Sequence, residues 1–244
     1  MPAPLTVAVA QPACFESGRP DTVTVNVERH AATVRAAGAR LVVFPEFSLT
    51  GYDLAAPALT VDDARLAPLV AACAETGSVA LVGAPVADPD GRREYIATLA
   101  VSGEGVGLAC RKIHLHGQEG ERFTPAEEPS VLELDGFRLG LAICADVAEP
   151  GHAARTAALG IDAYVASALY GDSESQLERR DGHTRERAVT HGVWGVMSTG
   201  AGASGEFATT SGGSGVWAPD GTLVGQAGEE PGGIVRVELR KPTA

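Results

Sequence analysis

Short apolar runs that stop abruptly at a reactive residue are the feature that most restricts how this chain can fold. Leu41–Phe44 leads straight into Pro45 and Glu46, and the largely apolar run Phe137–Ile143 leads straight into Cys144. Apolar runs of about four to eight residues, bounded by turns, are typical of strands buried in a sheet. Such a sheet needs covering layers on its faces, and the group that follows each strand comes to the edge of the sheet. The sequence therefore predicts a layered α/β fold with a carboxylate and a thiol at strand ends.

Helical and strand-like segments alternate along the first part of the chain, and hairpin signals appear in the middle and at the end. Apolar residues recur at helical spacing over Val23–Ala37, and further helices are expected over Arg65–Glu75, Pro150–Leu159 and Ser173–Thr190. The expected strands are Leu5–Gln11, Leu41–Phe44, Val79–Pro85, Tyr95–Val101, Gly105–Leu115, two within Val131–Ile143, Asp162–Leu169, Val193–Ser198, Ser214–Ala218, Thr222–Gln226 and Ile234–Leu239. With no linker or repeat between them, we expect one α/β domain over residues 1–244.

Charge and cysteine content limit the classes of partner and the compartment. The 244-residue chain has a formal net charge of −12, and an acidic surface repels nucleic acid and anionic lipid. Its four cysteines include no C-x-x-C pair, which argues against structural zinc or a redox dithiol. The first residues lack the basic and apolar regions of a secretory signal, and no run reaches the roughly 20 apolar residues of a membrane span. We therefore expect a cytoplasmic protein with free thiols and no nucleic-acid or membrane partner.

Four side chains carry groups suited to acyl transfer. Glu46 follows an apolar strand, where partial desolvation would raise its pKa and make it a better general base. Lys112 could stabilise an oxyanion, and a carboxylate from either Glu119 or Glu121 could hold its ammonium in place. The Cys144 thiol needs a neighbouring base, cation or helix N-terminus to become nucleophilic, and the helix expected next in the chain offers such a terminus.

Each of these residues alone also has an ordinary structural explanation. A glutamate or lysine at a strand end often points to water, and a free cysteine is often a small core residue. The other three cysteines, Cys14, Cys73 and Cys110, are interpreted in that way. Alternation along the expected strand Gly105–Leu115 would place Lys112 on the same face as the histidines that follow it, His114 and His116.

Taken in order, the motifs resemble those of the nitrilase (carbon–nitrogen hydrolase) superfamily. The matching segments are Pro45–Tyr52, Arg111–Leu115, Glu119 seven residues after Lys112, Ile143–Asp146, the opening Val7–Gln11 and the closing Gly213–Gly221. The resemblance implies a four-layer αββα sandwich, usually a homodimer formed through helices, and a reaction that needs no metal or organic cofactor. It also implies residue roles: Glu46 as general base, Lys112 as oxyanion stabiliser, Cys144 as nucleophile, Glu119 as supporting carboxylate and the Ala145 N–H as a second oxyanion donor.

The chain departs from the family pattern around the nucleophile, which leaves the substrate open. Ala145 stands where an aromatic residue is common, and Ala148-Glu-Pro-Gly151 replaces a familiar Arg-Phe-Pro-Glu-like run. The expected activity is hydrolysis of a small amide through a thioester, with N-carbamoyl amides and nitriles as alternatives. From their places beside strand ends, the substrate pocket is expected to include Tyr52, His116, Tyr170 and Trp194.

Three competing hypotheses use other features of the sequence. Gly200–Gly205 fits the dinucleotide pattern G-x-G-x-x-G after a strand, although the following residues are poor helix formers. A divalent metal could be ligated by His114, His116, Glu119 and Glu121, although their spacing matches no zinc pattern. A scaffold without activity that binds a partner is the third hypothesis, and the presence of all the catalytic residue types argues against it.

Overall fold

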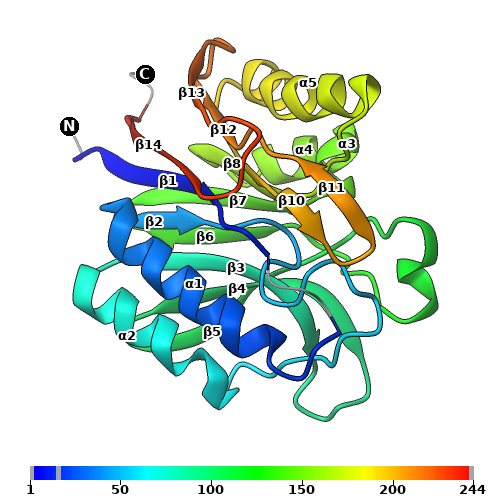
Figure 1. Ribbon diagram of the computed structural model, residues 1–244. Helices are drawn as coiled ribbons and strands as arrows, with labels where there is room; N and C mark the ends of the chain where they lie inside the picture. Colours follow the sequence, from blue (N-terminus) through cyan, green and yellow to red (C-terminus); the bar gives the residue numbers. More distant parts are fainter. Residues whose placement is uncertain (1–2, 15–17, 242–244) are drawn as a thin grey trace.

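Two six-stranded sheets lie face to face, and helices cover the outer face of each (Figure 1). The computed structural model describes residues 3–14 and 18–241. The first sheet has the strand order β14-β1-β2-β3-β4-β5, and the second has the order β13-β12-β9-β8-β7-β6. This arrangement confirms the predicted α/β class and the four-layer αββα sandwich.

The first sheet is mixed, with parallel pairing at its centre and antiparallel pairing toward both edges. Its strands are β14 (Gly233–Leu239), β1 (Leu5–Gln11), β2 (Leu41–Val43), β3 (Val79–Ala87), β4 (Glu94–Ser102) and β5 (Gly105–Arg111). Strands β1, β2 and β3 are parallel to one another, and the remaining pairs are antiparallel. Its covering helices are α1 (Thr22–Ala37) and α2 (Ala67–Thr76), the second preceded by the 3-10 turn Ala64–Leu66.

The second sheet repeats this plan. Its strands are β13 (Leu223–Gln226), β12 (Gly215–Trp217), β9 (Trp194–Thr199), β8 (Ala163–Ala168), β7 (Phe137–Ile143) and β6 (Ser130–Leu134), with β7, β8 and β9 parallel. Helices α3 (Ala145–Ala148), α4 (Pro150–Ala157) and α5 (Glu174–His191) lie on its outer side (Figure 1). A separate two-stranded hairpin is formed by β10 (Ala201–Ser204) and β11 (Phe207–Ser211).

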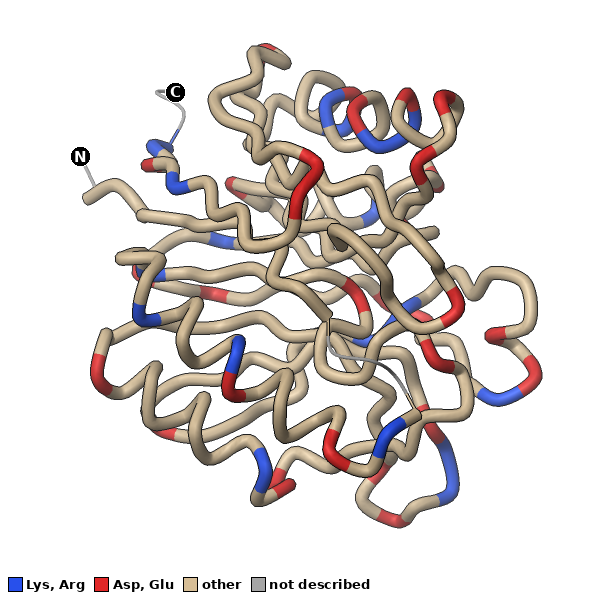
Figure 2. Tube along the Cα trace, in the orientation of Figure 1, with Lys and Arg blue, Asp and Glu red and all other residues tan. Residues whose placement is uncertain are grey.

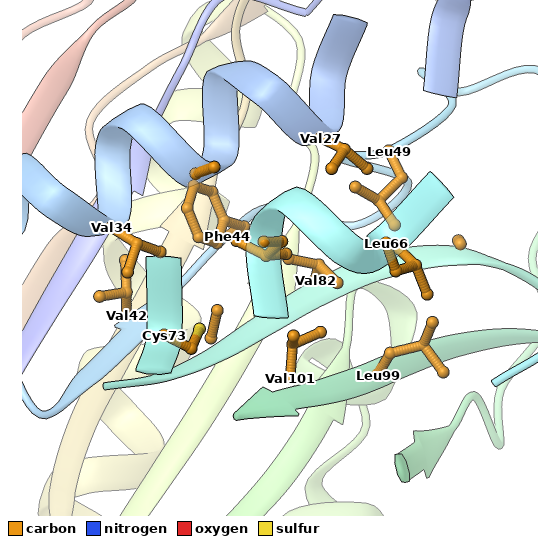
Figure 3. Packing of buried hydrophobic residues seen from close by; sticks show 14 of the residues in the cluster. Val27, Val34, Val42, Phe44, Leu49, Leu66, Cys73, Val82, Leu99 and Val101 are labelled. Carbon is orange, nitrogen blue, oxygen red and sulfur yellow. The ribbon is translucent and has the colours of Figure 1, made fainter. Parts of the chain in front are cut away.

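Three apolar layers hold the four layers of backbone together. Val27 and Val34 of α1 pack with Cys73 of α2 against Val42 and Val82 of the first sheet (Figure 3). A second cluster fills the space between the sheets, and a third lies between the second sheet and its helices. Strands buried on both faces explain why their sequences read as unbroken apolar runs rather than as alternating ones.

Charged side chains are concentrated on helices and loops, while the strands between them are nearly free of charge (Figure 2). The Arg35–Glu75 ion pair, for example, joins the exposed sides of α1 and α2 at 2.6 Å. Within residues 3–14 and 18–241, the structure contains no helix both long and apolar enough to cross a membrane.

The structure differs from the sequence predictions in one strand end and in one element that was not predicted. The strand expected over Gly105–Leu115 ends at Arg111. The Lys112 N–H still donates to the Ile96 carbonyl at 2.8 Å, but the N–H groups of Ile113 and His114 then donate to the Asp146 carboxylate, so the chain leaves the first sheet. The hairpin of β10 and β11 was not expected, because its glycine, serine and threonine residues carry no apolar alternation.

Candidate active site

Residues from three strand ends meet where the two sheets face each other. Glu46 follows β2 and Lys112 follows β5 in the first sheet, and Cys144 follows β7 in the second. The Lys112 Nζ atom lies 2.7 Å from Glu46 Oε1 and 2.7 Å from Glu119 Oε1. The side chains of Lys112, Glu46 and Glu119 are each at most 1% exposed, so all three charged groups are buried together.

Glu119 is the most heavily hydrogen-bonded of these side chains. Its Oε1 atom also accepts a hydrogen bond from the Tyr52 hydroxyl at 2.9 Å, and its Oε2 atom accepts one from the His116 N–H at 2.7 Å. The second bond belongs to a capping box at the start of the 3-10 helix Gly117–Glu121. Glu121, the alternative second carboxylate, is exposed at the end of the same short helix.

Burial and the neighbouring charges shift the pKa values of Glu46 and Lys112. Burial raises the pKa of Glu46, and the Lys112 ammonium only partly opposes that shift. Burial alone would lower the pKa of Lys112, but Glu46, the Cys144 sulfur and Glu119 outweigh it and raise that pKa. Two buried carboxylates beside one ammonium leave an excess negative charge, so a proton on Glu46 is stabilised more than at the protein surface.

Cys144 has a strained backbone and a protonated thiol. Its φ of 46° and ψ of −99° lie in a region that costs a non-glycine residue about 1–3 kcal/mol. The turn is fixed by a hydrogen bond from the Cys144 N–H to the Ser167 carbonyl, at 2.9 Å. Burial, followed by the Glu46 charge, raises the pKa of the thiol to about 12. The group is therefore a thiol near neutral pH and needs a base before it can attack.

The helix that follows Cys144 is not the one predicted. Helix α3 begins at Ala145, directly after the thiol, whereas α4 begins at Pro150 as expected. The helix N-terminus directly after the thiol is therefore that of α3, not that of α4. Of the three kinds of activating group considered for the thiol, a base and a cation both act on it, as Glu46 and Lys112.

A cavity of about 370 Å³ opens onto the side chains that meet at the strand ends. Its lining includes Glu46, Glu119 and Cys144 together with four residues expected at the pocket: Tyr52, His116, Ala145 and Tyr170. The remaining lining residues are Ala148, Leu169, Gly171, Gln176, Arg179, His183 and Phe207. A cavity of this size, with apolar walls and a few polar groups, is suited to a small organic molecule.

The family model for carbon-nitrogen hydrolases matches residues 6–244. This chain belongs to the carbon-nitrogen hydrolase family. The hydrolase is 31% identical over 224 residues to a hydrolase of Mycobacterium tuberculosis, covering 84% of this chain and 79% of that protein. It is 27% identical over 230 residues to an (R)-stereoselective amidase of a Pseudomonas species, covering 91% of this chain and 82% of the amidase.

Among solved structures, the hydrolase resembles an amidase of Nesterenkonia sp. AN1 from the nitrilase superfamily. A mutant of that amidase in complex with butyramide superposes with a TM-score of 0.83 at 26% identity, covering 97% of this chain and 91% of the other. Another mutant of it shows covalent addition of the acetamide moiety of fluoroacetamide at the active site cysteine.

Trp194 was wrongly predicted to line the pocket of this carbon-nitrogen hydrolase. It begins β9 and lies opposite Ala163, the first residue of β8. The Cys144 N–H, by contrast, donates to the carbonyl of Ser167, near the far end of β8. Because β7, β8 and β9 are parallel, the start of β9 lies at the opposite edge of the sheet from the residue that follows β7. The Trp194 indole N–H instead donates to the Arg240 carbonyl at 2.8 Å.

Asp146 has a positioning role in the hydrolase that the sequence did not reveal. Its buried carboxylate accepts hydrogen bonds from the N–H groups of Ile113 at 3.2 Å, His114 at 2.8 Å and Ile143 at 3.1 Å. It also lies 2.9 Å from His114 Nδ1. The carboxylate thus ties the segment after Lys112 to the turn of Cys144, and the signal available was an acidic residue two positions after the cysteine.

The same contacts correct the prediction that the lysine and the two histidines share one strand face. Lys112 points into the buried cluster, His114 bonds to Asp146, and His116 precedes the 3-10 helix. The proposed metal ligands are therefore directed to different partners. In the part of the chain that the structure describes, no three side chains of His, Cys, Asp or Glu converge as a metal site would require.

The dinucleotide hypothesis for this hydrolase is overturned by the backbone after Gly200. That motif needs a helix immediately after the glycine-rich turn, so that the helix N-terminus can face the pyrophosphate. Residues 201–211 instead form the β10–β11 hairpin, and its Phe207 lies in the cavity wall.

Proposed function

We propose that the protein is an amidase that hydrolyses small amides through a thioester on Cys144. The observation that carries this proposal is the Cys144 thiol beside the Glu46 carboxylate, which itself lies 2.7 Å from the Lys112 ammonium. The amidases named among the similar proteins support the same class of substrate.

The first half of the reaction requires one proton transfer and one new bond. Glu46 accepts the thiol proton while the Cys144 sulfur attacks the amide carbon. Glu46 then passes the proton to the nitrogen, and the carbon–nitrogen bond breaks to release ammonia or an amine. Positioned acid–base groups typically accelerate such steps by about 10²–10⁴-fold.

The developing oxyanion needs donors that are not already committed. An ammonium has three N–H groups, and Lys112 uses two of them for Glu46 and Glu119, which leaves one for the oxyanion. The Ala145 N–H is the first of helix α3, so it has no acceptor within the helix. Loss of one such donor typically costs about 10²–10³-fold in kcat.

The second half of the reaction reverses these roles. Glu46 removes a proton from water, which attacks the thioester carbon, and the released sulfur regains its proton as the carboxylic acid leaves. Glu119, 2.7 Å from the Lys112 ammonium, holds it in position throughout. Because each proton has a donor and an acceptor among these side chains, the proposed reaction requires no metal or organic cofactor.

Ammonia release from a panel of aliphatic amides, N-carbamoyl amino acids and nitriles tests this proposal. We expect turnover of small amides by the native protein and none by Cys144→Ala, whose fold is checked by circular dichroism. Ammonia release that persists in Cys144→Ala would show that another group is the nucleophile. Turnover confined to carbamoyl compounds or nitriles would overturn the amidase assignment.

We further propose that the protein is a homodimer, as the family resemblance implies. Val189 of α5 and Leu223 and Val224 of β13 are large apolar side chains that remain 50%, 47% and 46% exposed. Helix α5 adjoins the turn between β12 and β13, since Val189 lies against Gly221 of that turn. Light scattering should give twice the mass of the chain, and Val224→Asp should reduce it to that of a monomer; a monomeric native protein would refute the proposal.

A further inference from the structure

One wall of the active-site cavity is built from a polar face of helix α5. Gln176, Arg179 and His183 all line the cavity, and their spacing of three and four residues places them on one side of the helix. They add an amide, a guanidinium and an imidazole to a cavity whose other walls include Leu169, Phe207 and several small residues. These three groups have no part in the reaction described above.

Arg179 is the one arginine of α5 without an acceptor in the described residues 3–14 and 18–241. The other three have acceptors: Arg180 pairs with Asp181, Arg185 donates to the Gly221 carbonyl and Arg187 donates to the Val147 and Ala148 carbonyls. Its neighbours one helical turn away are Ser175, Gln176, Gly182 and His183, none of which is acidic. Arg179 therefore presents an unpaired positive charge at the cavity.

His183 is a second side chain of this wall with an unused hydrogen-bonding group. Its Nδ1 atom is buried and has no hydrogen-bond partner. Burial, followed by the charge of Arg187, lowers the pKa of its ring, so the imidazole is neutral near pH 7. A buried polar atom without a partner destabilises the protein, and a turn of the imidazole that brings this nitrogen to the cavity would let a polar ligand atom satisfy it.

The charges at the other end of the cavity determine where an anion can bind. Lys112 is already shared by Glu46 and Glu119, so the reacting end offers an anionic group no net attraction. Arg179 is the only lining residue with a permanent positive charge besides that buried cluster. A substrate anion would therefore lie against α5 while the amide lies at Cys144.

We propose that the substrate is an amide that also bears a carboxylate, a monoamide of a small dicarboxylic acid, and that Arg179 binds this carboxylate. The guanidinium can donate two parallel hydrogen bonds to the carboxylate, with His183 and Gln176 beside it. The inference rests on the proposed amidase function and names its substrate class. Because Arg179 is exposed, solvent and salt weaken the contact, and its effect is moderate rather than large.

The test compares charged and neutral amides of equal chain length. The kcat/KM values for succinamate and glutaramate are divided by those for butyramide and valeramide, in the native protein and in Arg179→Gln. We expect the native ratio to exceed one and to fall about 10-fold in the variant, as for loss of a hydrogen bond to a charged group. Raising the salt concentration should lower the native ratio in the same direction.

Arg185→Gln is the matched control, because Arg185 lies on the same helix but outside this cavity. It should leave the ratio of the two kcat/KM values unchanged. Arg179→Glu should instead favour an ω-amino amide such as 5-aminopentanamide over glutaramate. A ratio that is the same in Arg179→Gln and in the native protein would overturn the inference while leaving the amidase assignment intact.

Binding measurements separate failure of this inference from failure of the proposed function. Calorimetric titration of glutarate into Cys144→Ala reports the carboxylate site without turnover, and Arg179→Gln on that background should weaken binding about 10-fold. If glutarate binds in this way but no amide is hydrolysed, the amidase proposal fails and the anion site stands. Selective turnover of N-carbamoyl amino acids would place the carboxylate on the departing amine and refute the dicarboxylate assignment.

Discussion

Replacing Glu119 by glutamine tests the arrangement of the buried charges most directly. Three donors converge on its two carboxylate oxygens: the Lys112 ammonium at 2.7 Å, the Tyr52 hydroxyl at 2.9 Å and the His116 N–H at 2.7 Å. A glutamine of the same shape offers one acceptor oxygen and places an NH₂ group where the other oxygen was. At least one donor therefore loses its acceptor beside a side chain that is only 1% exposed.

The size of the effect follows from that loss. Leaving one buried donor unpaired costs about 1–3 kcal/mol, and breaking a buried ion pair by removing one partner costs about 3–5 kcal/mol. Lys112 keeps Glu46 as a partner, so we expect about 3 kcal/mol of destabilisation for Glu119→Gln. For a chain of 244 residues, each kcal/mol shifts Tm by about 2–4 °C, which gives a fall of about 6–12 °C.

Activity should fall as well, because Glu119 also raises the pKa of Glu46 through its charge. Without that charge Glu46 is a weaker base, and Lys112 is less firmly held for the oxyanion, so we expect kcat/KM to drop at least about 100-fold. The assays are thermal unfolding and ammonia release, with the exposed Glu121→Gln as the matched control. Equal losses in both variants, or a Glu119→Gln protein within twofold of the native one, would refute this reasoning.

Two further predictions concern pH. Because burial raises the pKa of Glu46, the acid-side fall in kcat/KM should lie at a higher pH than an ordinary glutamate would give. Above that fall, kcat/KM should stay level to pH 9, since the Cys144 thiol has a pKa of about 12. A rate that keeps climbing through pH 9 would point to a resting thiolate instead. Burial lowers the pKa of His30 to about 4, so the unfolded chain takes up this proton first and stability is lost as pH falls from about 6.5 to about 4. His30→Phe should remove up to about 3 kcal/mol of that loss in urea unfolding compared at pH 7 and pH 4.5, whereas an identical pH dependence in both proteins would contradict the assignment.

The pattern of strands and helices predicted a layered α/β fold with reactive groups at strand ends, and the family resemblance implied the four-layer sandwich. Parallel strands end at a common edge, so an acid after β2 and a thiol after β7 come together once the two sheets face each other. The position of Lys112 could not be predicted in the same way, because it lies beyond the end of β5 and not on a strand face. Its segment is held by the Asp146 carboxylate, a long-range contact that no local pattern encodes.

The substrate-facing wall was the part least accessible from sequence. Gln176, Arg179 and His183 lie on a helix with many charged residues (Figure 2), and such a face is ordinarily directed to water. Phe207 belongs to a hairpin that apolar alternation did not reveal. Trp194 was assigned to the wrong edge of its sheet, because a strand's sequence does not show which of its ends faces the site.

Burial explains why the thiol and its base act together and not separately. The same desolvation raises the pKa of Cys144 and of Glu46, and transfer of the thiol proton at rest would move the negative charge from the carboxylate, 2.7 Å from the Lys112 ammonium, to a poorly solvated sulfur. The transfer becomes favourable only when the sulfur shares its electrons with a carbonyl carbon and the negative charge moves to an oxygen beside Lys112. A site built in this way stabilises charge where it develops during the reaction, and leaves the free thiol unreactive until an amide is bound.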